Sequence, residues 1–151
     1  MLNLECKPFE ELSTDELYRI MWLRQEVFIV EQNCVFSDLD YKDQKAWHCM
    51  AKKSDGQIVA YTRLFDENDY YEGFLSIGRV VAAPAVRKEG SGRIIFGYSV
   101  NKIQELFGNK PIKIGAQAYL ERFYESFGFK SIYKDYIEDG IEHKLMVREA
   151  I

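Results

Sequence analysis

Two Asp-Gly dipeptides limit how this chain can fold. Asp55-Gly56 and Asp139-Gly140 each stand between two apolar runs rich in β-branched and aromatic residues. An Asp-Gly pair in this setting is the strongest short-range signal for a β-hairpin, because both residues tolerate the positive φ of a tight two-residue turn. The sequence therefore predicts antiparallel strand pairing in both halves of the chain.

Hydrophobic spacing supplies the remaining elements. A capping-box pattern at Ser13 and Glu16 opens an amphipathic helix over residues 14–30. Further helices are expected at 93–107 and 119–127, strands at 2–8, 47–53, 58–65, 74–82, 112–116, 131–137 and 141–148, and loops at 34–45 and 66–73. The order β-α-β-β-β-α-β-α-β-β predicts an α/β (α+β) domain, in which a mixed sheet carries helices on its faces.

Composition excludes several classes of protein. A length of 151 residues fits one domain, 1–151, and 47% hydrophobic with 29% charged residues is typical of a globular chain rather than a disordered one. The net charge of −4 argues against a nucleic-acid partner or an anionic membrane surface. We expect no membrane span and no signal peptide, and three cysteines without CxxC spacing predict reduced thiols in the cytoplasm.

A glycine-rich loop lies between an expected strand and the helix that follows it. Arg87, Gly90 and Gly92 form the pattern Arg-x-x-Gly-x-Gly. The free N–H groups at a helix start attract anions, and glycine lets the backbone approach a phosphate closely. Lys88 and Arg93 add positive charge. The loop lacks the Gly-Lys-Ser/Thr of a Walker loop and the third glycine of a dinucleotide fingerprint, so it predicts a phosphate site of another class.

Two motifs carry a resemblance to a known family. The segment 80–92 resembles motif A of the GNAT N-acetyltransferases, whose loop holds the pyrophosphate of acetyl-CoA. Gln117, Tyr124 and the pair Gly128-Phe129 resemble motif B, with Gln117 where Asn is usual. The chain is most similar to the ElaA group of that family, through the segments 23–34, 77–80, 115–118, 123–129 and 138–141.

The resemblance implies a GNAT acyl-CoA N-acyltransferase fold, with a mixed, mostly antiparallel central sheet of about seven strands flanked by about four helices. It also implies an acetyl-CoA-dependent enzyme. An acetyl group would pass directly to a primary amine on a small molecule or a peptide, without a covalent enzyme intermediate and without a metal. Tyr124 is the implied general acid, because a phenol with a pKa of about 10 is protonated at neutral pH. The alternative for Tyr124 is packing alone. The implied cofactor-binding residues are Val80, Val81, Ala82, Arg87, Lys88, Glu89, Gly90, Ser91, Gly92, Arg93 and Gln117.

The sequence does not identify a general base. Ile112 stands where some relatives carry a glutamate. Glu31, Asp40 and His48 are candidates on the N-terminal half, which lines the acceptor side in this family. A proton route through water, with no single base, is the alternative.

Charged residues in apolar surroundings need partners. Arg24 and Arg79 are expected either to orient a carboxylate of the acceptor or to pair internally with an acid such as Glu31. The aspartate spacing over residues 38–43 resembles a calcium loop only in part, because the required glycine and the final glutamate are missing. Cys34 is expected to be a buried thiol rather than a nucleophile.

Other functions remain as alternatives at this stage. The same fold could transfer another acyl group, act on an O-linked acceptor, or bind an acyl-CoA without catalysis. The intact Tyr124 favours an enzyme over a binding or interaction module. A dinucleotide oxidoreductase is disfavoured, because the antiparallel hairpins do not suit a doubly wound sheet. A monomer and a homodimer are both compatible with the sequence.

Overall fold

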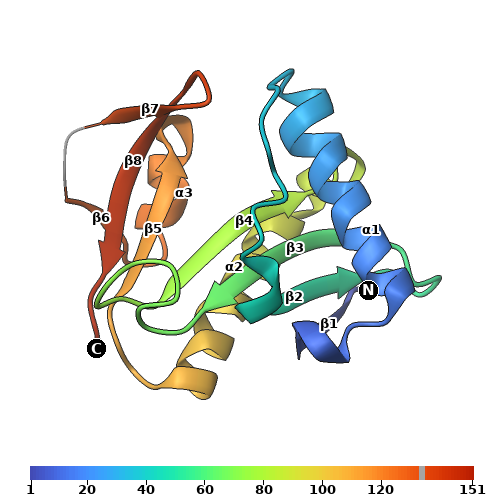
Figure 1. Cartoon of the computed structure of the whole chain (residues 1–151), viewed down its shortest axis with the longest axis horizontal. Helices are drawn as coiled ribbons and strands as arrows, with labels where there is room; N and C mark the ends of the chain where they lie inside the picture. The colour runs from blue at the N-terminus through green and yellow to red at the C-terminus, as the bar shows by residue number, and fades with distance from the viewer. Residues whose placement is uncertain (133–134) are drawn as a thin grey trace.

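The computed structural model describes residues 1–132 and 135–151, which form two antiparallel sheets (Figure 1). The first sheet has the order β1-β2-β3-β4, from β1 (Asn3–Pro8), β2 (Trp47–Lys52), β3 (Ile58–Phe65) and β4 (Ser76–Ala82). In the second sheet β8 is central, and the strands are β5 (Ile112–Gln117), β6 (Lys130–Ser131), β7 (Tyr136–Glu138) and β8 (Ile141–Arg148).

The two sheets meet where β4 and β5 begin. A single parallel bridge joins Leu75 to Ile112, and the Lys113 N–H donates to the Leu75 carbonyl at 2.9 Å. Beyond this point the two strands diverge, as Figure 1 shows. The β5-facing edge of β4 therefore has no neighbouring strand within the described residues.

Within the described residues, three α-helices connect and cover the sheets. Helix α1 (Thr14–Arg24) begins with the predicted capping box, in which Ser13 Oγ accepts from the Glu16 N–H at 3.0 Å. The chain then continues as the π-helical segment η2 (Gln25–Glu31). Helix α2 (Ser91–Phe107) starts two residues earlier than expected, and α3 (Glu121–Glu125) follows the 3₁₀ turn η5 (Ala118–Leu120). Three further 3₁₀ turns are η1 (Phe9–Glu11), η3 (Asp43–Lys45) and η4 (Pro84–Glu89).

Both faces of the first sheet are buried. Ala60 and Leu64 of β3 belong to the core formed with α2, whereas Tyr61 belongs to the core formed with Ile20 and Leu23 of α1. Alternation along a strand sends successive side chains to opposite faces, which explains why all of β3 is buried. The face that carries α2 also packs against α3 and the second sheet, so one core underlies both sheets.

The fold class is confirmed, with some differences in detail. Both predicted hairpins are present, and Asp139 and Gly140 have φ of +52° and +78°, as a type I′ turn requires. The strand expected over 131–137 is instead β6 and β7, and residues 133–134 lie outside the described part. The expected single sheet is divided in two by the divergence of β4 and β5. In the part of the chain that is described, no helix is long and apolar enough to cross a membrane.

Candidate functional site

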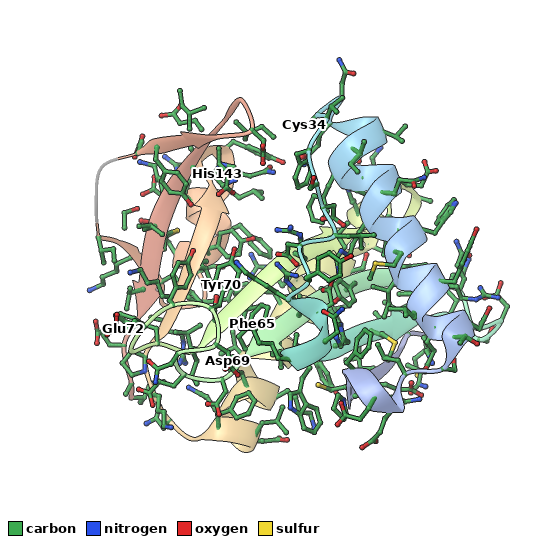
Figure 2. The ribbon with its side chains drawn as sticks, viewed as in Figure 1. Cys34, Phe65, Asp69, Tyr70, Glu72 and His143 are labelled. Carbon is green, nitrogen blue, oxygen red and sulfur yellow. The ribbon has the colours of Figure 1, made fainter. Side chains whose placement is uncertain are left out.

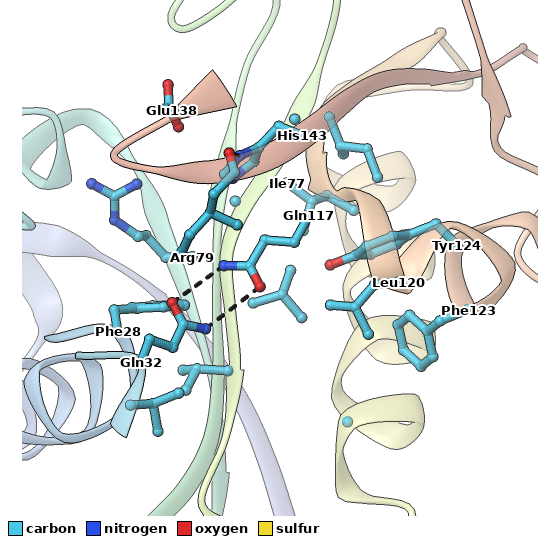
Figure 3. A pocket seen from close by; sticks show the side chains of 18 of the residues that line it. Phe28, Gln32, Ile77, Arg79, Gln117, Leu120, Phe123, Tyr124, Glu138 and His143 are labelled. Atoms are coloured by element: carbon cyan, nitrogen blue, oxygen red, sulfur yellow. Dashed lines mark hydrogen bonds between the residues drawn. The ribbon is translucent and has the colours of Figure 1, made fainter. Parts of the chain in front are cut away.

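A cavity of about 800 Å³ opens between the diverging strands β4 and β5. One wall is the β4 edge together with the end of η2, and the other is formed by β5, β7, β8 and the start of α3 (Figure 3). Figure 2 shows His143 on the second wall, Cys34 on the facing side, and Tyr70 beside Phe65 near the base of the opening. We call this cavity the β4–β5 cleft.

The start of α2 forms an open cradle at one end of the cleft. Gly90 has a φ of +77°, a left-handed conformation that favours glycine, and no side chain caps the helix. A Cβ added at Gly92 would meet no atom within 4 Å. The Ser91 hydroxyl is buried and donates to the Val86 carbonyl, so it is not available to a ligand. The Arg93 guanidinium lies over the Phe123 ring at 5.4 Å. Its positive charge and the free backbone N–H groups of the first turn of α2 together suit an anion.

A bulge in β4 changes the direction of its backbone where it lines the cleft. Arg79 and Val80 together stand opposite Thr62, and Arg79 has a φ of +48°. Bulges of this kind redirect the peptide groups of a strand. The Val81 side chain is buried among α1 residues, so it offers the cleft its backbone alone.

Tyr124 of α3 is held by aromatic rings and directs its hydroxyl into the cleft (Figure 3). Its ring meets those of Phe96 and Phe123 edge-on, at 5.0 and 5.1 Å between centroids. Burial raises the pKa of Tyr124 above that of an ordinary phenol, so the hydroxyl keeps its proton at neutral pH. Among the described residues the hydroxyl has no hydrogen-bond partner, which leaves its proton available to a molecule in the cleft.

Gln117, at the end of β5, lines the cleft and bonds across it. Its carboxamide and that of Gln32 donate to each other at 3.3 and 3.5 Å (Figure 3). Nearby, the Cys34 thiol donates to the Asp139 carbonyl at 3.1 Å. The segment that follows η2 is therefore tied to the second wall. Lys88 and Glu89 are exposed and lie outside the cleft lining.

Glu31 and Arg87 pair with each other across the mouth of the cleft. The guanidinium contacts both carboxylate oxygens at 2.5 Å, and its Nε donates to the Ala82 carbonyl at 3.0 Å. The hydrogen bonds from Arg87 lower the pKa of Glu31. Glu31 is consequently a weak base, and a phosphate must compete with it for Arg87.

Asp40 and His48 do not line the cleft, and the structure does not support either as a base. Asp40 accepts from Arg63 at 2.7 and 2.9 Å; burial raises its pKa, but these contacts outweigh burial and hold the pKa well below its usual range. His48 is fully buried, which lowers its pKa. Its Nδ1 lies 2.6 Å from the Tyr61 hydroxyl and its Nε2 2.9 Å from the Asp43 carbonyl, so both ring nitrogens are engaged.

A buried network of arginines and aspartates lies under the first wall. Arg24 contacts Asp38 at 2.9 Å and Asp43 at 2.7 Å, and Arg79 contacts Asp38 at 2.7 Å. The interpretation that the two arginines pair internally is confirmed, although their partners are loop aspartates rather than Glu31. Within the described residues, no group of His, Cys, Asp and Glu is arranged to hold a metal ion.

The sequence analysis missed the polar side chains of the second wall. The hydroxyls of Tyr71 and Tyr136 converge above Gly115, where an added Cβ would come within 3.2 and 2.6 Å of them. His143 of β8 also lines the cleft. A glycine inside a strand is a recognised sign of close approach, but it does not identify what approaches.

The comparison that decides the family covers most of the chain. The sequence profile of the acetyltransferase (GNAT) domain matches residues 20–150. The chain belongs to the GNAT family. This membership assigns the chain to the acyltransferases that use acyl-CoA.

Full-length relatives confirm the predicted similarity to the ElaA group of GNAT proteins. Protein ElaA of Escherichia coli (strain K12) is 40% identical over 153 residues, covering 100% of this chain and 99% of ElaA. UPF0039 protein sll0451 of Synechocystis is 38% identical over 147 residues, covering 97% of this chain and 94% of that protein.

Two solved structures agree in fold along almost the whole length. An acyl-CoA N-acyltransferase from Pseudomonas aeruginosa has a TM-score of 0.91 and 38% identity, covering 97% of this chain and 99% of that one. The crystal structure of Escherichia coli ElaA has a TM-score of 0.91 and 37% identity, covering 99% and 100%. The predicted GNAT fold is therefore confirmed.

Proposed function

We propose that this protein is an acetyl-CoA-dependent N-acetyltransferase that acts on a primary amine by direct attack, with no covalent enzyme intermediate. The observation that carries the proposal is the placement of Tyr124. Its protonated hydroxyl, free of partners among the described residues, opens into the same cleft as the uncapped start of α2.

The residues of the cleft fit acetyl-CoA. The backbone N–H groups of Ser91, Gly92 and Arg93 and the Arg93 guanidinium would hold the pyrophosphate. Gly90 would let it approach the backbone closely, with Lys88 and Glu89 contributing at the edge of the loop. The unpaired β4 edge at Val80, Val81 and Ala82 would bind the pantetheine arm as an added strand would. Gln117 would bond the same arm. The bound cosubstrate supplies an activated acetyl group as a thioester.

Two groups of this chain would assist the transfer. The bulged β4 backbone would donate to the acetyl carbonyl oxygen, where negative charge develops. Tyr124 would donate its proton to the sulfur that leaves. The ring packing against Phe96 and Phe123 fixes the position of that hydroxyl before any substrate binds.

Ligand-dependent thermal stability tests the proposal. Binding to the folded state alone raises the melting temperature by mass action. We expect stabilisation by acetyl-CoA, weaker stabilisation by longer acyl-CoAs, and none by NAD. Stabilisation by NAD but by no CoA compound would overturn the proposal.

Amine-dependent CoA release separates an enzyme from a binding module. We expect free CoA to appear when acetyl-CoA is mixed with a suitable primary amine, whether a small molecule or a peptide. Acetyl-CoA binding without release on any amine would favour the non-catalytic alternative. Faster release from another acyl-CoA would reassign the acyl group.

We also propose a cytoplasmic location, which the free thiols Cys6, Cys34 and Cys49 support.

A further inference from the structure

His143 occupies the middle of the second wall. It pairs in register with Gln117 of β5 on one side and with Tyr136 of β7 on the other. Directly paired residues on neighbouring strands place their side chains on the same face of a sheet. His143 therefore faces the side from which Gln117 reaches across the cleft, and it is one of the lining residues (Figure 3).

The imidazole of His143 is held in one orientation, and its neutral form is held as one tautomer. Its Nδ1 lies 2.8 Å from the Ile141 carbonyl oxygen, which can only accept a hydrogen bond. Nδ1 therefore carries the hydrogen, and in the neutral ring Nε2 keeps a lone pair. The ring of Tyr136 stacks on the imidazole at 5.5 Å and 28°. Within the described part of the chain, Nε2 has no hydrogen-bond partner.

The other candidates for a base are already engaged. Glu31 is paired with Arg87, Asp40 is paired with Arg63, and both nitrogens of His48 are bonded in the core. His143 is the second of the two histidines in the sequence, and its Nε2 is the free basic nitrogen on the cleft wall.

We propose that His143 Nε2 is the general base that removes a proton from the acceptor ammonium, an assignment that rests on the proposed function. Nε2 takes one proton of R–NH₃⁺, becomes imidazolium, and leaves a neutral amine. The amine nitrogen forms a bond to the acetyl carbon while the carbon–sulfur bond breaks. The electron pair of the broken carbon–sulfur bond stays on sulfur. Tyr124 protonates that sulfur, and the second proton leaving the nitrogen restores the phenol. His143 then returns its proton to solvent, so each acetyl transfer releases one proton.

Groups of both charges lie around His143. Lys144, the next residue along β8, points to the opposite face, where it pairs with Asp135 at 2.7 Å. Glu138 lines the cleft at the end of β7 and has no ion pair among the described residues. The titratable or charged residues that share the cleft lining with His143 include Tyr136, Glu138 and Asp139 of the β7–β8 hairpin, Tyr70 and Tyr71 of the 66–73 loop, Arg79 of β4, Cys34 and Tyr124.

His143→Asn is the most informative variant, because the asparagine amide can still donate to the Ile141 carbonyl. The probes are acetyl-CoA and a panel of primary amines comprising butylamine, 1,4-diaminobutane, benzylamine, glycinamide and a tetrapeptide. With the best acceptor of the wild type, we expect kcat/KM at pH 7 to fall by about 10²-fold, the lower end of what general bases contribute. The deficit should shrink towards pH 10, where the acceptor loses its own proton. Stabilisation by acetyl-CoA should be unchanged.

His48→Asn is the matched control, since it removes the other histidine without touching the cleft. We expect it to lower the melting temperature and to leave the shape of the pH profile unchanged. If His143→Asn gives no acetyl-CoA-dependent stabilisation, His143→Gln serves as the second variant.

The outcomes separate the two proposals. A rate for both His143 variants equal to that of the wild type, or a deficit of the same size at every pH, would overturn the assignment of His143 and leave the N-acetyltransferase proposal standing. No amine-dependent CoA release by the wild type on the whole panel would overturn both.

Discussion

The two walls of the β4–β5 cleft differ in how their polar side chains are paired. Under the first wall, the buried guanidinium of Arg24 and the almost fully buried side chain of Arg63 each contact aspartates of the 38–43 loop at 2.7–3.0 Å. On the second wall, the Tyr124 hydroxyl, the His143 Nε2 and the Glu138 carboxylate have no such partner among the described residues.

This difference separates residues that hold shape from residues that can react. A buried charge that is fully paired is costly to disturb and offers nothing to a ligand. A polar group left free inside a cleft can bind or exchange a proton with what enters it. The first wall therefore fixes the bulged β4, and the second wall carries the free side chains on which our proposals for proton transfer rest.

Tyr124→Phe gives the sharpest test of the second wall. We expect kcat to fall by about 10²- to 10⁴-fold, the range that proton transfer contributes, because the leaving sulfur loses its proton donor. The ring packing against Phe96 survives, so acetyl-CoA should stabilise the variant as it stabilises the wild type. Steady-state CoA release and thermal shift measure the two quantities. A kcat equal to that of the wild type would mean that Tyr124 contributes packing alone and is not the general acid.

Asp43→Asn tests the first wall. It leaves the buried guanidiniums of Arg24 and Arg63 sharing a neutral amide, and breaking a buried ion pair costs about 3–5 kcal/mol. We expect the melting temperature to fall by roughly 10 °C, at about 2–4 °C per kcal/mol for a chain of this size. Asp15→Asn, which removes an exposed pair with Arg19, is the matched control and should change little.

Acid should reduce the penalty of Asp43→Asn. Burial raises the pKa of Asp43, but Arg24 and Arg63 outweigh burial and lower it below its usual range. A depressed carboxyl pKa adds stability above the pKa of the unfolded chain, which is about 4, and loses it as the pH falls through the folded value. The two proteins should therefore differ most at neutral pH and converge in strong acid. A gap of the same size at pH 2 and pH 7 would contradict this account.

Gly115→Ala probes the space between the walls. The new methyl group would come within 2.6 Å of the Tyr136 hydroxyl, so that ring must move. We expect kcat/KM for the amine to fall roughly ten- to a hundredfold, because small misplacements near a reacting group are costly. Adding Tyr136→Phe removes the clashing oxygen and should restore part of the loss. If the double variant is no better than Gly115→Ala, the hydroxyl contact is not the cause.

Glu31→Gln has the smallest expected effect. It frees Arg87 for the phosphates of acetyl-CoA, and an exposed ion pair of this kind is worth only about 0.2–1 kcal/mol. We expect the Kd for acetyl-CoA, measured by calorimetry at low salt, to improve by up to about fivefold, with the melting temperature nearly unchanged. Weaker binding would mean that the pair shapes the site instead of competing with the ligand.

Local chemistry made much of the fold predictable. The Asp-Gly turns and the Ser13–Glu16 capping box each depend on a few adjacent residues, and both are predictable from the sequence. The glycine-rich loop before α2 is equally local, although the helix starts two residues earlier than expected. The position of Tyr124 followed from the motif resemblance, and its packing in the aromatic cluster agrees with helical spacing.

Contacts between distant segments were not predictable in the same way. The π-helical winding of η2, the division into two sheets and the pairing of Arg24 with the 38–43 loop depend on tertiary packing. His143 was missed because a histidine in a strand gives no sign of which face it occupies. Its place in the cleft depends on the register of β8 against β5, which is a property of the folded sheet.

The reciprocal bond between Gln32 and Gln117 spans the cleft, so a ligand that bonds to either carboxamide must first separate the two. The two carboxamides satisfy each other, so separating them leaves two donors and two acceptors without partners unless the entrant replaces them. An entrant whose own backbone contains amide groups, as the pantetheine arm does, exchanges one amide pair for another at little net cost. A purely hydrocarbon molecule makes no such exchange.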